Sequence, residues 1–181
     1  MKVLILDGSP EAGGPFGAWL AKLEPSLRDE GHEVRRLLLR DLTIAQCQGC
    51  FECWTKTPGR CRTRDDAAQL LPAVLESDLV VHASPVKMGF VSPLLKRCQE
   101  RLLPLLHPYV RLVQGEVHHR LRYAHYPRIA LVHGDEGCDE EDARILTDIY
   151  RAVALETETK LALVASAAMA PEEVAHALGR A

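Results

Sequence analysis

Val3-Leu4-Ile5-Leu6, followed at once by Asp7-Gly8-Ser9-Pro10, is the stretch of this 181-residue chain that decides its fold. Four consecutive apolar residues predict a strand buried on both faces, as in a parallel sheet covered by helices. A Gly-rich loop then runs to Gly17, and helical spacing begins at Ala18. Backbone N–H groups in such a loop, next to a helix N-terminus, can surround a phosphate. The motif is neither GxGxxG nor a P-loop, so a plain strand-to-helix turn is an equal alternative.

The same pattern, a short apolar run followed by a helical stretch, repeats along the chain. It predicts further strands at Glu33–Leu39, Leu79–Ala83, Arg128–Val132 and Thr157–Val164. It predicts helices at Ala18–Asp29 (which Pro25 should kink or interrupt), from Asp65 or Asp66 to Ser77, and at Ser92–Leu103, Asp139–Ala154 and Pro171–Leu178. Strands that alternate with helices pair in parallel, because each crossover needs a helix. We therefore predict a single α/β domain over residues 1–181, with a flavodoxin-like doubly wound five-stranded parallel sheet of order 2-1-3-4-5.

This strand order also predicts where a ligand binds. In doubly wound sheets, ligands lie outside the carboxyl ends of the strands, near the point where the strand order reverses. The loops that follow the first, third and fourth strands are residues 7–17, 84–91 and 133–138. Each loop begins with Gly or Pro or soon reaches one. We expect the binding site to lie where these three loops meet.

Composition excludes several functional classes. The formal net charge is −3, which gives no basic surface for nucleic acid. No apolar run approaches the roughly 20 residues of a membrane helix, and the N-terminal apolar stretch is too short for a signal peptide. We therefore expect a cytoplasmic protein without nucleic-acid or membrane partners. In that compartment the six cysteines are expected to be thiols or metal ligands rather than structural disulfides.

The most specific motif is a cysteine run within a long loop, residues 41–64. The spacing is Cys47-x2-Cys50-x2-Cys53-x7-Cys61, and Gly49 allows a tight bend between ligands. Three closely spaced sulfurs and a fourth can hold a 4Fe–4S cluster, which Phe51 and Trp54 would shield and Arg60, Arg62 and Arg64 would neutralise. Zinc is an alternative, although structural zinc sites commonly use two separated ligand pairs. A metal-free thiol loop is the third possibility.

The remaining histidines and cysteines give weaker signals. Residues 104–127 form a second long excursion with His107, His118, His119 and His125, whose spacing fits no common zinc site. We expect these side chains to be solvated or to lie at a subunit interface. His82 is expected to be a hydrogen-bonded core residue and Cys98 a small buried apolar one. His133 and Cys138 lie in or beside the predicted site loops; His133 is a candidate catalytic residue, and Cys138 is expected to be a loop thiol.

Several segments resemble a known family. Val3–Pro10 and Ser77–Pro85, together with Ser92-Pro93-Leu94-Leu95-Lys96, are similar to the NAD(P)H-dependent FMN reductases. The cysteine loop with Asp65-Asp66 resembles the iron–sulfur flavoproteins within that group. The resemblance implies that Ser9 binds the FMN phosphate. It also implies that the flavin ring is lined by Pro85, Val86, Lys87, Met88, Gly89 and Phe90, with Gly134 close by.

The chain departs from the family pattern at two places. Glu11 stands where family members usually have a basic residue, and Gly13–Gly17 lacks the usual Asn, Ser and Thr. Each missing hydroxyl removes a hydrogen bond of roughly 1 kcal/mol. Lys87 replaces an aromatic residue that often contacts the flavin, and a cation there would favour an anionic reduced flavin.

Together these observations predict an FMN-binding electron-transfer oxidoreductase with NAD(P)H as the electron donor and a 4Fe–4S cluster in the cysteine loop. Cys47, Cys50, Cys53 and Cys61 would be the cluster ligands. The acceptor would be a small molecule or a redox protein, and the expected assembly is a homodimer or homotetramer. One alternative is a metal-free NAD(P)H:FMN or quinone reductase. Another is a non-catalytic flavodoxin-like protein that uses its thiols, or a zinc ion, as a redox sensor.

Overall fold

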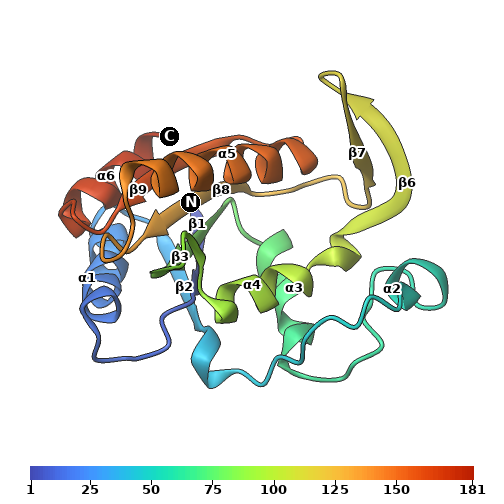
Figure 1. The fold of residues 1–181 in the computed structure, drawn as a ribbon, viewed down its shortest axis with the longest axis horizontal. Helices are drawn as coiled ribbons and strands as arrows, with labels where there is room; N and C mark the ends of the chain where they lie inside the picture. Colours follow the sequence, from blue (N-terminus) through green and yellow to red (C-terminus); the bar gives the residue numbers. More distant parts are fainter.

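The structure, a computed structural model that describes residues 1–181, is built on a parallel sheet of order β2-β1-β3-β8-β9 (Figure 1). Every neighbouring pair in this sheet is parallel. The strands are β1 (Lys2–Asp7), β2 (Glu33–Leu38), β3 (Leu79–Ser84), β8 (Arg128–His133) and β9 (Leu161–Ser166). Since β8 and β9 are the fourth and fifth predicted strands, the predicted flavodoxin-like order is confirmed.

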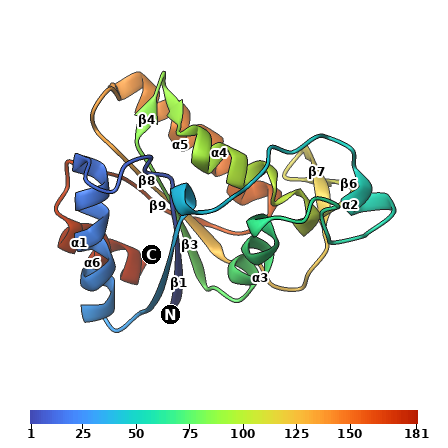
Figure 2. The same cartoon turned by 90° about the horizontal axis from the view of Figure 1, so that it is seen from below.

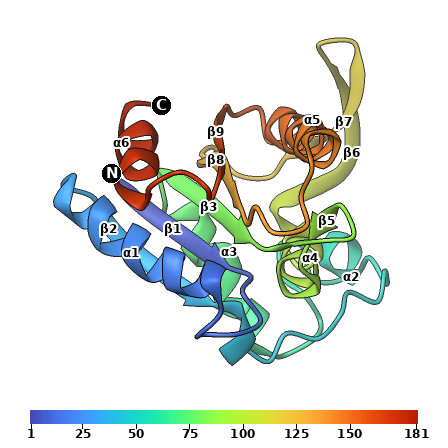
Figure 3. The ribbon, with the colours of Figure 1, turned by 60° about the vertical axis from the view of Figure 1, so that its left-hand side comes forward.

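Helices cover both faces of the sheet, which explains why its central strands are continuous apolar runs. One face packs on α1 (Pro15–Asp29) and α6 (Pro171–Arg180), and the other on α3 (Leu70–Leu75), α4 (Pro93–Glu100) and α5 (Glu140–Glu156) (Figure 3). Along β1 the side chains alternate between the two cores. Val3 and Ile5 pack with the α1 and α6 residues, while Leu4 and Leu6 pack with those of α3 and α4.

A lateral extension is built from the two segments that were predicted as long loops. The cysteine loop contains one helical turn, α2 (Glu52–Thr55), and residues 104–127 contain an antiparallel hairpin of β6 (Leu106–Val113) and β7 (Glu116–Leu121). Figure 2 shows α2 and this hairpin together on the side of the molecule away from α1 and α6. The short 3-10 helices are η1 (Leu39–Asp41), η2 (Asp66–Gln69) and η3 (Leu103–Leu105).

Several predicted boundaries were wrong. The fifth strand begins at Leu161 rather than Thr157, because Thr157 caps the end of α5 and Glu158 follows in a turn; Thr157 Oγ1 donates to the carbonyl of Val153. Pro25 lies inside α1 without interrupting it, on the exposed side of the helix. The helix predicted from Asp65 or Asp66 is divided into η2 and α3, and Asp65 caps it by accepting the Ala67 N–H at 3.1 Å. None of the helices combines the length and apolar character that a membrane crossing requires.

Candidate functional site

The three predicted site loops meet at the carboxyl ends of β1, β3 and β8. The Gly8 N–H donates to the carbonyl of Ala83 at 2.8 Å, and the Gly134 N–H donates to that of Ser84 at 2.9 Å. Ser92, which caps α4, connects two of these loops. Its hydroxyl donates to the Gly8 carbonyl at 2.7 Å, and its N–H donates to Ser84 Oγ at 2.7 Å. The loops therefore form one fixed surface.

The loop after β1 presents unpaired hydrogen-bonding groups. The Ser9 hydroxyl oxygen is buried and has no hydrogen-bond partner within the chain. The N–H groups of Gly13, Gly14, Phe16 and Gly17 likewise donate no hydrogen bond within the chain. A cluster of free N–H groups at a helix N-terminus suits an anion, and α1 starts at Pro15. The residues present therefore fit a phosphate group.

Gly17 is needed where this loop enters α1. A Cβ at position 17 would lie 2.7 Å from the Glu11 carbonyl oxygen and 2.9 Å from that of Ala12. The loop therefore folds back tightly against the first turn of the helix. This folding also brings the Glu11 carboxylate to 3.9 Å from the position that a Cβ on Gly14 would occupy. A negative side chain thus lies at the same helix N-terminus as the free N–H groups.

Asp7 holds the base of this loop in place. Its side chain is fully buried, and one carboxylate oxygen accepts the Ser9 N–H at 2.8 Å. The other oxygen accepts two hydrogen bonds from the Arg36 guanidinium, at 2.7 and 3.0 Å. Sequence reasoning treated Asp7 only as a strand end. The available signal was a carboxylate directly after a buried strand, with Arg residues in and after the neighbouring strand.

Residues 85–91 form a small hairpin of β4 (Val86–Lys87) and β5 (Phe90–Val91). Met88 and Gly89 have φ values of 52° and 73°, as a two-residue turn between antiparallel strands requires. Val86 is only 3% exposed and packs in the core, so only its backbone can face a ligand. Met88 projects fully into solvent, and Lys87 is also exposed.

Gly134 brings the third loop close to the other two. A Cβ at this position would lie 3.3 Å from Pro85 Cα and 3.6 Å from the Phe16 ring. His133, considered as a catalytic candidate, is 6% exposed, and its Nδ1 lies 3.0 Å from the Gly134 carbonyl. Its side chain lines a separate cavity of about 700 Å³ between α5 and β9. Gly134 is therefore better placed than His133 to lie beside a ligand bound by these loops.

The cysteine loop gathers its thiols around Cys53. All four cysteines are free; Cys53 is buried, Cys47 half-buried, and Cys50 and Cys61 exposed. Burial raises the pKa of the Cys53 thiol, and the nearby Cys61, Cys47 and Cys50 raise this pKa further. No group of three or more Cys, His, Asp or Glu side chains has the arrangement that would hold a metal ion in this structure. The donor set suits iron–sulfur chemistry, but the ligands are not assembled.

A buried ion pair fastens the stem of the cysteine loop. Arg101, 3% exposed at the end of α4, donates to both carboxylate oxygens of Asp65 at 2.7 and 2.9 Å. Arg101 also donates to the Ala45 carbonyl at 2.7 Å, and Asp65 accepts the Ala45 N–H at 2.9 Å. Asp66 accepts the Thr43 N–H at 2.7 Å. The chain segments before Cys47 and after Cys61 are thus held side by side.

Sequence reasoning missed Arg101 and misjudged part of the histidine segment. His118 was expected to be solvated or intersubunit. It is 7% exposed, and its Nδ1 lies 2.6 Å from a Glu156 carboxylate oxygen, because the hairpin folds back on the end of α5. Two further predictions, for His82 and Cys98, are confirmed. His82 lies in the core, 3.2 Å from the Tyr150 hydroxyl, and Cys98 is fully buried.

Comparison with known proteins supports the family resemblance seen in the sequence. The chain is 33% identical over 105 residues to an iron–sulfur flavoprotein of Methanocaldococcus jannaschii, which covers 58% of this chain and 53% of that protein. It is 36% identical over 107 residues to an iron–sulfur flavoprotein of Archaeoglobus fulgidus, a match that covers 59% of this chain and 48% of that protein. Among solved structures, an azoreductase from Bacillus anthracis superposes with a TM-score of 0.68 at 13% identity and full coverage of both chains.

The family match covers more of the chain than the matches to the two curated relatives. The chain spans about half the length of the two curated relatives named above, and the azoreductase likeness concerns the fold alone. Residues 1–120 match the family described as NADPH-dependent FMN reductase. This span includes the loop after β1, the cysteine loop and the β4–β5 turn. The chain therefore belongs to the NADPH-dependent FMN reductase family.

Proposed function

We propose that the protein is an FMN-binding oxidoreductase that takes electrons from NAD(P)H and passes them on through a 4Fe–4S cluster in its cysteine loop. The observation that carries the flavin part is the loop after β1. There a buried Ser9 hydroxyl without a partner lies in the same loop as four unpaired N–H groups. Buried polar groups are rarely left without a partner, so this loop is suited to an external acceptor.

The chain's own residues bind and position the cofactor. Ser9 Oγ and the N–H groups of Gly13, Gly14, Phe16 and Gly17 would donate to the FMN phosphate. The exposed turn at Lys87, Met88 and Gly89 would lie against the flavin ring, with Pro85 and Gly134 at its base. FMN can accept a hydride as two electrons and release them one at a time. No side chain needs to act as an acid or base, so the protein contributes binding and orientation.

The cysteine loop is the proposed cluster site. The support consists of four free thiols, with Cys47, Cys50 and Cys61 near Cys53, a stem fixed by Arg101 and Asp65, and a spacing typical of cluster ligands. The two archaeal relatives bear the name iron–sulfur flavoprotein, which is consistent with this proposal. Cluster binding would require these thiols to rearrange, because no metal-ligand group is assembled in this structure.

A metal-free NAD(P)H:FMN or quinone reductase is the second candidate. The observation that favours it is the absence of a preassembled metal-ligand group in the structure. Both candidates use the same flavin site, so iron content distinguishes them.

An anaerobic ultraviolet–visible spectrum of freshly purified protein tests both candidates. Flavin bands on a broad brown shoulder that bleaches with dithionite are the expected result. A flavin spectrum without the shoulder, and without iron, would support the metal-free reductase. A colourless protein that does not take up added FMN would contradict the flavin proposal and favour a thiol or zinc sensor.

We also propose that the β6–β7 hairpin mediates self-association. Leu112 pairs with Val117 across the hairpin, and Val110 lies two residues from Leu112 on the same face. These three residues are 73%, 67% and 54% exposed, whereas Arg111 and His118 on the opposite face pair with Glu158 and Glu156. An exposed apolar face on a projecting hairpin is typical of a subunit contact.

Light scattering tests this proposal. The wild-type protein is expected to be a dimer or tetramer, and Leu112→Asp is expected to convert it to a smaller species. Tyr109→Ser, a change at an exposed residue outside this face, is the control. A wild-type monomer, or an assembly unaffected by Leu112→Asp, would contradict the proposed interface.

A further inference from the structure

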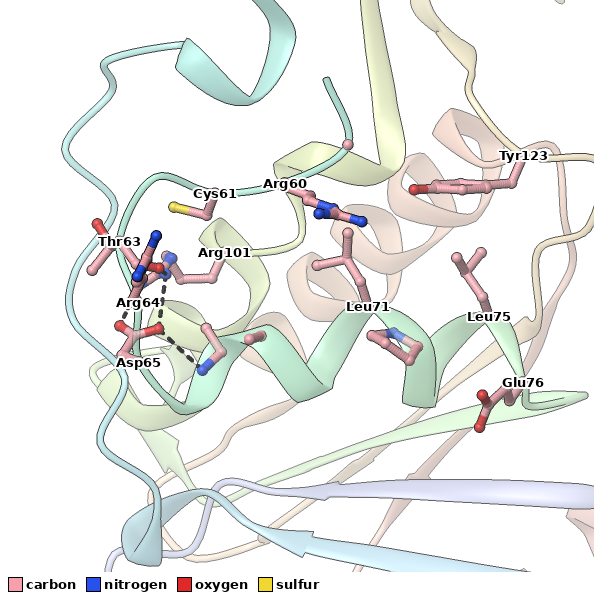
Figure 4. A pocket seen from close by; sticks show the side chains of 14 residues that line it. Arg60, Cys61, Thr63, Arg64, Asp65, Leu71, Leu75, Glu76, Arg101 and Tyr123 are labelled. Atoms are coloured by element: carbon pink, nitrogen blue, oxygen red, sulfur yellow. Dashed lines mark hydrogen bonds and ion pairs between the residues drawn. The ribbon is translucent and has the colours of Figure 1, made fainter. Parts of the chain in front are cut away.

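A cavity of about 800 Å³ lies between the end of the cysteine loop and α3 (Figure 4). None of the residues proposed to contact FMN lines it, so it is separate from the flavin site. Its size is within the range of small-molecule sites, which is roughly 300–1,000 Å³. The cysteine loop supplies one wall, and η2 and α3 supply another.

Three arginines bring positive charge to the cavity: Arg64 and Arg101 lie on the Asp65 side of Cys61, and the Arg60 guanidinium lies over Leu71 (Figure 4). Arg101 is committed to Asp65, yet its buried Nε has no hydrogen-bond partner. The guanidinium groups of Arg60 and Arg64 form no ion pair or hydrogen bond within the chain, in contrast to that of their neighbour Arg62, which pairs with Glu52 at 3.0 Å. Two guanidinium groups are therefore free to bind an anion.

The end of the cavity away from Asp65 is apolar except for Glu76 (Figure 4). Leu71 and Leu75 extend from α3 into it, and the Tyr123 ring lies across from them (Figure 4). Tyr123 is fixed near the rim, because a Cβ on Gly59 would lie only 3.1 Å from its hydroxyl oxygen. The second carboxylate of the lining, Glu76, lies at this end, away from the cysteine end where Asp65 pairs with Arg101 (Figure 4).

We propose that this cavity binds an organic anion with a flat apolar body. The carboxylate, sulfonate or phosphate group of the ligand is held by Arg60 and Arg64. Its apolar body packs against Leu71, Leu75 and the Tyr123 ring. Arg60, Arg64 and Cys61 belong to the cysteine loop, whereas the apolar wall comes from α3 and Tyr123, outside both proposed cofactor sites.

The test uses the fluorescent anion 8-anilino-1-naphthalenesulfonate and its neutral analogue N-phenyl-1-naphthylamine, with FMN present in excess to occupy the flavin site. The anion is expected to bind at least about tenfold more tightly than the neutral analogue. The double variant Arg60→Gln/Arg64→Gln is expected to weaken binding of the anion by about tenfold or more. Arg62→Gln, which removes a neighbouring charge that does not line the cavity, is expected to leave it unchanged.

Two further measurements separate this inference from the proposed function. Ala68→Trp should fill the cavity and abolish binding of the anion, while FMN uptake stays the same. Binding of the anion to Cys50→Ala should match the wild type, whether or not that variant loses iron. Equal binding of the anion by wild type and the Arg60→Gln/Arg64→Gln variant, or equal affinity for the neutral analogue, would overturn the proposal.

Discussion

The loop after β1 and the cysteine loop are both proposed to hold a cofactor, but different interactions fix them in place. The first follows directly from a strand in the apolar core, and backbone hydrogen bonds to the neighbouring strand ends, together with the Asp7–Arg36 ion pair at its base, hold it in place. The second has little core of its own and depends on charged side chains at its stem, chiefly Arg101 and Asp65. The flavin site should therefore tolerate surface substitutions, whereas the cysteine loop should depend on a few individual residues.

The largest expected effect is on iron. Cys50→Ala should abolish iron binding, because a cluster that has lost one of its four thiolate ligands is not retained. Cys50 is exposed and packs against nothing in the core, so folding and FMN uptake should be unchanged. Iron content and the visible spectrum are the measurements, and Cys138→Ala, outside the cysteine run, is the control. Full iron occupancy in Cys50→Ala would refute the ligand assignment.

The next largest effect is expected for the ion pair at the stem of the cysteine loop. Arg101→Met leaves Asp65 buried without its partner, and breaking a buried ion pair in this way costs about 3–5 kcal/mol. Urea unfolding followed by circular dichroism measures the loss. The matched control is Arg62→Met, whose pair with Glu52 is exposed and should contribute at most about 1 kcal/mol.

The double variant Arg101→Met/Asp65→Asn sharpens this prediction. It removes the uncompensated charge, so it should be more stable than Arg101→Met alone. Equal stability of Arg101→Met and Arg62→Met would show that the stem does not depend on this ion pair.

Acidification should affect the sheet and the cysteine loop in different pH ranges. Burial lowers the pKa of His82 in β3 from 6.5 to about 4, so the folded protein keeps this histidine neutral while the unfolded chain takes up a proton. The free energy of unfolding should fall as the pH drops from about 6.5 toward 4, by up to about 3 kcal/mol. His82→Gln should flatten this dependence, and His176→Gln, on the surface, should not.

Asp65 responds in a different pH window. Burial opposes its ionisation, but hydrogen bonds from Arg101 and the backbone lower its pKa below the usual 3.8. Its contribution is therefore complete above pH 3.8 and is lost only below it. Between pH 6.5 and 4, far-ultraviolet circular dichroism should report weakening of the sheet without a separate transition of the loop. A loop transition in this range would contradict the assignment.

The sequence predicted the parts of the structure that depend on residues close together in the chain. The buried run Val3–Leu6 and its counterparts predicted the sheet and its order, because a continuous apolar stretch has few other uses in a globular chain. The β6–β7 hairpin was not predicted, because the apolar residues on one of its faces are exposed to solvent rather than buried. Its one local signal was Gln114-Gly115, both with positive φ in the turn. The burial of Arg101 could not be predicted, since its partner lies 36 residues away.

A smaller effect tests the phosphate site. Ser9→Ala removes a hydroxyl that has no partner within the chain, so stability without FMN should be unchanged or slightly higher. FMN affinity should fall by about fivefold, which corresponds to about 1 kcal/mol for one hydrogen bond. Fluorescence titration with FMN measures the affinity, and Ser26→Ala on the outside of α1 is the control. Unchanged FMN affinity would place the phosphate elsewhere.

The smallest effect has opposite signs with and without FMN. The Glu11 carboxylate lies near the N-terminus of α1, where a negative charge stabilises the helix by about 0.3–1 kcal/mol. Glu11→Gln should therefore lower the melting temperature of the FMN-free protein slightly. The same change removes a charge that repels the phosphate, so FMN should bind about two- to fivefold more tightly. Thermal unfolding and FMN titration measure the two effects, and Glu172→Gln, in the first turn of α6, serves as the control. If Glu11→Gln weakened FMN binding, the carboxylate would have to contribute to the flavin site rather than compete with the phosphate.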